Sequence, residues 1–139
     1  MLLDVSSSMA GKKIDILKKA AEVAVDSIED EESQILIAKF SSTFELLTDQ
    51  GPLKCTAENK TKLKQKIIGL TFDSAVQSSN AINLSFALKE CFEGEKIAPN
   101  AGDMPRSIVI FSNGNLVNQG SVEALLTASQ APDALSWFE

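Results

Sequence analysis

The chain has 139 residues, of which 44% are hydrophobic and 23% charged, with a net charge of -6 and no histidine. This size and composition are typical of one soluble globular domain. The acidic balance argues against nucleic acid as a partner, because a phosphate backbone requires clustered lysine and arginine. The lack of histidine excludes a Ser-His-Asp triad, a Cys-His pair and the usual zinc sites.

The cysteines do not form a metal-binding motif, and the apolar runs do not indicate a membrane span. Cys55 and Cys91 are too few and too far apart for a metal-binding motif, and the sequence does not determine whether they pair. No secretory signal is visible, and no apolar run approaches the roughly 20 residues that span a bilayer. Because the chain starts inside an apolar run, we expect one partial domain over residues 1–139, truncated at both ends.

The first stretch of the chain, residues 1–9, begins as an apolar run, which is followed by one carboxylate and several hydroxyl groups. In an extended chain, side chains alternate between faces, so Asp4, Ser6 and Ser8 should point the same way. Oxygen ligands with a single formal charge suit Mg2+ or Ca2+ and leave positions open for water or a partner's carboxylate. The alternative is a strand followed by a serine-rich turn that caps the next helix.

The middle of the chain alternates between helical and strand patterns. Apolar residues spaced three and four apart predict helices over Lys12–Glu29 and Ala57–Leu70. The acidic run at residues 29–32 is interpreted as a solvated loop. Gln34–Phe40 is predicted to be a buried strand, and Phe44–Leu47, after a three-residue turn, is predicted to form a hairpin with it.

The second half continues the alternation. A polar stretch at residues 73–80 precedes a helical pattern over residues 84–91. Ser107–Phe111 is a continuous apolar run after its first residue, which predicts a strand buried on both faces, and it stops at the polar residues 112–115. A short helix is predicted over residues 121–129.

This order of elements predicts an α/β fold, a Rossmann-like open and mostly parallel sheet with helices on both faces. In such sheets ligands bind at the carboxyl ends of the strands. The three polar breaks, after Leu3, around Ser78 and after Phe111, are therefore expected to converge on one rim.

These residues resemble a von Willebrand factor A (VWA) domain with its metal-ion-dependent adhesion site. The DxSxS motif of the family is matched in full at residues 4–8, its threonine falls at Ser78 with Ser79 as a rival, and its Thr-Asp-Gly is Ser-Asn-Gly at residues 112–114. The ligands that the resemblance implies for one divalent cation, Mg2+ or Ca2+, are Asp4, Ser6, Ser8, Ser78 and Asn113. Because Asn113 replaces a carboxylate, we expect weaker or more partner-dependent metal binding, with a metal-free structural descendant as the alternative.

Within that family the sequence is similar to the domain of the alpha-2/delta auxiliary subunits of voltage-gated calcium channels. The likeness is carried by residues 4–11, by residues 59–64, by Ser85–Ala87 and by Ile108–Phe111. It implies a glycoprotein at the extracellular face of the plasma membrane, membrane-associated through parts outside this chain, whose metal site engages the pore-forming channel subunit.

An extracellular location would give two further residues a role. Asn59 begins the glycosylation sequon Asn-Lys-Thr at the expected start of a helix. Cys55 becomes a candidate for a disulfide to a segment outside this chain.

The sequence therefore predicts a non-enzymatic, metal-dependent protein-binding module in which an acidic residue of the partner supplies the last cation ligand. One alternative is a VWA-fold scaffold or adhesion domain that binds partners without metal. Another is a phosphotransferase with Asp4 as its nucleophile, which is disfavoured because Ser6 stands where such enzymes generally place a second acid.

Overall fold

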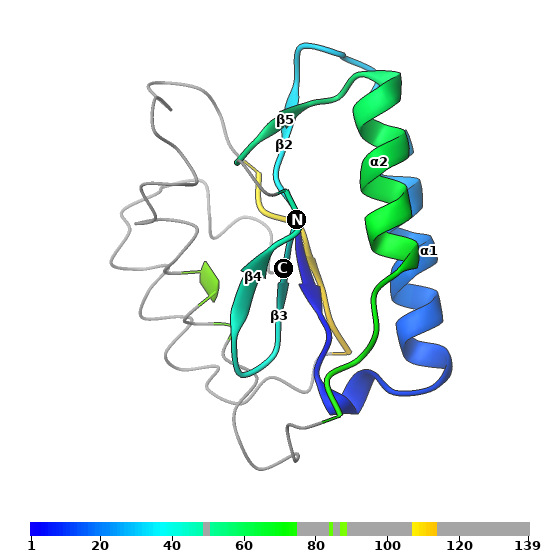
Figure 1. Ribbon diagram of the computed structural model, residues 1–139, viewed down its shortest axis with the longest axis vertical. Coiled ribbons are helices and arrows are strands. Elements are labelled where there is room, and N and C mark those ends of the chain that lie inside the picture. The colour runs from blue at the N-terminus through cyan, green and yellow to red at the C-terminus, as the bar shows by residue number, and fades with distance from the viewer. Residues whose placement is uncertain (49–50, 75–83, 85–86, 89–106, 114–139) are drawn as a thin grey trace, which may run out of the picture.

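A mixed sheet forms the centre of the computed structural model, which describes residues 1–48, 51–74, 84, 87–88 and 107–113. Its strands are β1 (Leu2–Asp4), β3 (Ala38–Phe40), β4 (Phe44–Leu46) and β6 (Ile110–Phe111), in the order β4-β3-β1-β6. β1 pairs in parallel with β3 and with β6, whereas β3 and β4 pair antiparallel (Figure 1). The predicted α/β fold with a mostly parallel sheet is confirmed, and so is the predicted hairpin.

The two faces of the sheet bury separate apolar clusters, as the alternation of side chains along β1 requires. Leu3 and Val5 pack on the side of the two long helices, whereas Leu2 packs on the opposite side. There Leu2 meets Phe40 of β3 and the helical residues Leu84, Ala87 and Leu88. Helical residues thus cover both faces, as predicted.

Helix α1 (Lys12–Asp26) follows β1 after a single 3-10 turn, η1 (Ser7–Met9). The inward residues of α1 recur at spacings of three and four and are Ile14, Leu17, Ala21 and Val25. The helix ends before the predicted Glu29, with Ser27 as its C-cap, and the Ser27 hydroxyl donates to the Ala24 carbonyl at 2.8 Å.

Helix α2 (Ala57–Ile68) lies beside α1 on the same face of the sheet (Figure 1). Its N-cap is Thr56, whose hydroxyl accepts from the Asn59 backbone N–H at 3.3 Å. It buries Leu63 and Ile67, and its Lys64 forms a 2.8 Å ion pair with Asp26 of α1. The helix stops two residues short of the predicted Leu70, with Gly69 as its C-cap.

The prediction of one strand over Gln34–Phe40 is wrong, because the run is divided between two sheets. β2 (Gln34–Ile35) pairs antiparallel with β5 (Leu53–Lys54) in a separate two-stranded ladder. Two residues later β3 joins the central sheet, where the Ala38 backbone N–H donates to the Met1 carbonyl at 2.9 Å. A mostly apolar run indicates burial, and it does not reveal that the hydrogen-bonding partner changes midway.

The prediction of a fully buried strand over Ser107–Phe111 is also wrong. Only Ile110–Phe111 is a strand, with half-buried side chains, while Ile108 and Val109 are 39% and 45% exposed. The physical reason is the register, in which Leu2 is opposite Ile110. Residues before Ile110 therefore run past the first residue of β1.

No helix in the described part of the chain is long and apolar enough to cross a membrane. The short helix predicted over residues 121–129 lies outside the described residues, as does most of the one predicted over 84–91.

Candidate metal-binding site

The loop that follows β1 brings three predicted oxygen ligands together. Asp4 is the last residue of β1 and is fully buried, and its Oδ1 accepts from the Ser6 backbone N–H at 2.9 Å. This bond folds the chain into a tight turn of the Asx type. The hydroxyl oxygens of Ser6 and Ser8 are then 2.9 Å apart and hydrogen-bonded to each other. Asp4, Ser6 and Ser8 are therefore brought together as predicted, but by a turn and the 3-10 helix η1 and not by an extended strand.

The residues after β6 meet the same loop, because parallel neighbouring strands end at the same edge of a sheet. The Ser112 hydroxyl donates to Asp4 Oδ2 at 2.8 Å. The Asn113 side-chain nitrogen donates to the Ser8 carbonyl at 3.1 Å. The first and third polar breaks therefore converge as expected, whereas the second, at Ser78 and Ser79, lies outside the described residues.

Ser112 is the direct neighbour of Asp4, and sequence reasoning had assigned it no role. Leu3 is opposite Phe111 in the parallel pair, so the next residue along each strand brings Asp4 beside Ser112. Asn113, the predicted ligand, reaches this loop through its amide nitrogen at Ser8. The sequence does show a serine, Ser112, directly after the strand at residues 110–111. To predict that this serine meets Asp4, however, one must know the register between β1 and β6.

The chemistry of the Asp4 carboxylate fits a divalent cation. Within the described residues its two hydrogen-bond donors, the Ser6 N–H and the Ser112 hydroxyl, are neutral. Burying a carboxylate without a positive partner is costly, and a bound cation would supply the missing charge. Carboxylate and hydroxyl oxygens are the hard ligands that Mg2+ and Ca2+ prefer. The described residues hold no group of three or more His, Cys, Asp or Glu suited to a metal, so hydroxyl groups would complete the set.

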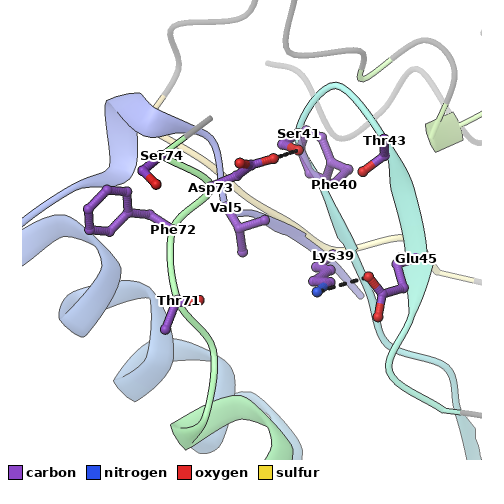
Figure 2. A pocket seen from close by; sticks show the side chains of 10 residues that line it. All are labelled: Val5, Lys39, Phe40, Ser41, Thr43, Glu45, Thr71, Phe72, Asp73 and Ser74. Atoms are coloured by element: carbon purple, nitrogen blue, oxygen red, sulfur yellow. Dashed lines mark hydrogen bonds and ion pairs between the residues drawn. The ribbon is translucent and has the colours of Figure 1, made fainter. Parts of the chain in front are cut away.

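A small polar pocket lies beside this loop (Figure 2). Its volume is about 290 Å³, and it opens between the β3–β4 hairpin and the segment of residues 71–74. At one end the Ser41 hydroxyl donates to Asp73 Oδ2 at 3.2 Å, and the Asp73 backbone N–H donates to the Val5 carbonyl at 2.6 Å. At the other end Lys39 and Glu45 form a 2.9 Å ion pair. Sequence reasoning missed the pairing of Ser41 with Asp73, residues 32 apart in the chain.

The structure places the two residues that an extracellular location would use at the start of α2. Cys55 is buried in the helix-side core, and this burial raises the pKa of its thiol. A disulfide to an outside segment would have to open that core, so the burial argues against the expected bond. The Asn59 side-chain nitrogen donates to the Lys54 carbonyl at 3.0 Å, and glycosylation there stays a prediction.

Comparison with known proteins identifies the family. The model of the von Willebrand factor type A domain matches residues 1–115. A search of curated proteins returned no match. Among solved structures, the chain is similar to a von Willebrand factor type A protein from Catenulispora acidiphila, with a TM-score of 0.58 and 18% sequence identity.

The structural match covers 72% of this chain and 22% of that protein, so the chain spans about a fifth of its length. At that identity the likeness concerns the fold alone. The family model, in contrast, covers most of the chain and includes both polar segments, residues 4–8 and 112–113, that meet at the buried Asp4. The chain belongs to the von Willebrand factor type A domain family.

Proposed function

We propose that this chain is a protein-binding module in which one divalent cation, Mg2+ or Ca2+, receives an acidic residue of a protein partner. VWA domains are generally protein-interaction modules. The residues that would hold the cation are Asp4, Ser6, Ser8, Ser78 and Asn113. The observation that carries the proposal is the fully buried Asp4 carboxylate, which has only neutral hydrogen-bond donors in the described part of the chain.

The charge of the ligand set explains why a partner's acid would be needed. Asp4 brings one negative charge, whereas Ser6 and Ser8 bring neutral oxygens and Asn113 brings an amide. A divalent cation in this set keeps one net positive charge, which an incoming carboxylate neutralises. The site should therefore bind the free ion weakly and the ion together with a partner more strongly.

Calorimetric titration of the chain with Mg2+ and with Ca2+ tests this proposal. We expect a Kd of about 0.1–1 mM for at least one ion, the range of weak extracellular calcium modules. Asp4→Asn should abolish the binding heat. Asn113→Asp should tighten binding by about tenfold, because it restores a charged oxygen beside the ion.

Asp30→Asn is the matched control. The carboxylate of Asp30 also accepts from a backbone N–H two residues on, that of Glu32, and from a serine hydroxyl, that of Ser33, both at 3.0 Å. It differs from Asp4 in being exposed and in lying on the acidic loop after α1. Binding that Asp30→Asn weakens as much as Asp4→Asn, or the absence of any binding heat in the unmodified chain, would contradict the proposed site.

We also propose that the chain is part of an auxiliary subunit of a voltage-gated calcium channel, at the extracellular face of the plasma membrane, and that its partner is the pore-forming subunit. The support is the sequence likeness at residues 4–11, 59–64 and 108–111. Capture of the pore-forming subunit by the full-length protein should require a divalent cation and should be lost in Asp4→Asn.

Glycosylation provides an independent test of the extracellular location. The full-length protein from a secretory host should lose mobility-retarding glycan when Asn59→Gln is introduced. An unglycosylated Asn59 together with chelator-resistant partner capture would instead support an intracellular scaffold of the same fold.

One observation favours a metal-free interaction module as the second candidate. The hydrogen bonds from Ser112 to Asp4 and from Asn113 to Ser8 join the two loops directly, protein group to protein group. A module of this kind would bind its partner equally well in chelator and in Mg2+. A phosphotransferase is disfavoured, because both oxygens of the buried Asp4 are hydrogen-bonded. Failure to trap phosphate on Asp4 would complete that exclusion.

A further inference from the structure

Lys13 places an ammonium group at the rim of the candidate site. Its Nζ donates to the Ser8 carbonyl at 3.2 Å, the same oxygen that accepts from the Asn113 side chain at 3.1 Å. The side chain is exposed, and in the described part of the chain it forms no ion pair with a carboxylate. The ammonium thus lies at the solvent-exposed edge of the loop that follows Asp4.

Lys13 is unfavourably placed for the stability of its own helix. It lies in the first turn of α1, where the helix dipole already provides partial positive charge, so a second positive charge there is repelled. The helix begins after Gly11 without a side-chain cap, so no N-cap side chain satisfies its first backbone N–H groups, and Asp15 is the acidic residue of its first turn. An anion at this position would relieve both effects.

Lys13 is also unfavourably placed for metal binding alone. An ammonium close to the ligand loop repels a divalent cation and lowers the affinity of the site for the free ion. The same charge attracts a carboxylate that approaches the cation. Its position therefore weakens the metal-only state and strengthens the state with a partner's acid bound.

We propose that Lys13 is a specificity residue that binds the acidic side chain of the partner directly, beside the cation. This inference rests on the proposed function, because the acid is the one expected to reach the metal. Lys13 would contribute to selection of a charged carboxylate over a neutral amide or hydroxyl group in the same position.

The test compares Lys13→Gln with Lys19→Gln, which removes the same charge from an exposed position further along α1. Calorimetry with Mg2+ alone should show affinity two- to fivefold higher in Lys13→Gln, the range expected for one exposed charge interaction. Titration of the labelled protein with N-acetyl-aspartate amide in saturating Mg2+, followed by NMR, should show affinity two- to fivefold lower. Lys19→Gln should change neither, and N-acetyl-asparagine amide should not bind.

Opposite shifts of the two affinities in Lys13→Gln alone would support the inference. Equal behaviour of the two variants, a weaker Mg2+ affinity in Lys13→Gln, or equal binding of the asparagine amide would overturn it. If the unmodified chain binds no Mg2+, the proposed function fails, and titration of the aspartate amide in chelator then tests Lys13 separately. If binding of the aspartate amide in chelator is lost in Lys13→Gln and kept in Lys19→Gln, the role of Lys13 is supported. Any other result would contradict it.

Discussion

Replacement of Asp4 by asparagine should remove the stabilisation that a bound cation gives the domain, while it should leave the stability of the metal-free domain nearly unchanged. Asparagine has the same shape, keeps an oxygen to accept from the Ser6 N–H, and presents an NH2 group to the Ser112 hydroxyl, which can rotate to accept. Removing the buried charge relieves desolvation, while the charge-assisted hydrogen bonds become neutral ones worth about 1 kcal/mol less each. These effects oppose each other, so in chelator the variant should unfold within about 1 kcal/mol of the unmodified chain.

Addition of a divalent cation should then raise the free energy of unfolding of the unmodified chain and leave that of Asp4→Asn unchanged. An ion that binds only the folded chain stabilises it by RT ln(1 + [L]/Kd), which is about 1.4 kcal/mol at ten times Kd. For a Kd of about 1 mM this requires about 10 mM ion. In a 139-residue domain such a gain raises Tm by roughly 4–6 °C.

The assay is thermal unfolding followed by circular dichroism, in chelator and in Mg2+ or Ca2+. Asp4→Asn should show no rise in Tm with either ion, and Asp30→Asn should show the full rise. An equal rise in Asp4→Asn, or none in the unmodified chain, would refute the assignment of the cation to Asp4. A loss of several kcal/mol in chelator would instead show that the carboxylate is required by the fold itself.

Three further outcomes test the packing and the charges. Ile67→Ala should cost about 2–5 kcal/mol in urea unfolding, because the side chain is fully buried, whereas Ile68→Ala, 57% exposed, should change stability by no more than about 0.5 kcal/mol. Cys55 should react with iodoacetamide at neutral pH only as fast as the core opens, measured by peptide mass spectrometry, and rapid labelling would contradict its burial and raised pKa. The hydrogen bond and charge of Lys62 lower the pKa of Glu58 below its ordinary 4.5, so its contribution to stability should be full above pH 4.5 and lost as the pH falls through the lower folded value. The difference in unfolding free energy between the unmodified chain and Glu58→Gln should therefore vanish in acid. A difference that increases as the pH falls would contradict this assignment.

Most features that the sequence predicted correctly are encoded within a few residues, and the meeting of residues 4–8 with residues 112–113 followed from the rule that parallel strands end at one edge of a sheet. Asp4, Ser6 and Ser8 gather because the Asx turn closes locally after β1 and the 3-10 turn follows it directly, and not because the strand continues through Ser8. The two long helices follow from apolar residues three and four apart, and the hairpin from a short polar turn.

The features that it missed depend on contacts between distant segments. Ser112 meets Asp4 across 108 positions of sequence, and a slip of one residue between β1 and β6 would have brought Asn113 there instead. The division of Gln34–Phe40 likewise depends on which strand supplies its hydrogen bonds, since Ile35 and Ile37 are buried on the helix side alike. Local periodicity contains neither the register nor the choice of partner.

Gly11 lies between the Asp4 loop and α1. At this position the backbone angles decide which residues fit, whereas the space around the residue would admit a larger side chain. Gly11 has φ of +74° and ψ of -139°, a combination that L-residues rarely adopt, yet an added L-alanine Cβ would meet no atom within 4 Å. The mirror image of those angles is the polyproline II region, which any L-residue adopts. A D-amino acid introduced at position 11 by chemical synthesis would therefore match the backbone. Because it also restricts the unfolded chain, D-alanine there should stabilise the domain by about 0.4–1 kcal/mol.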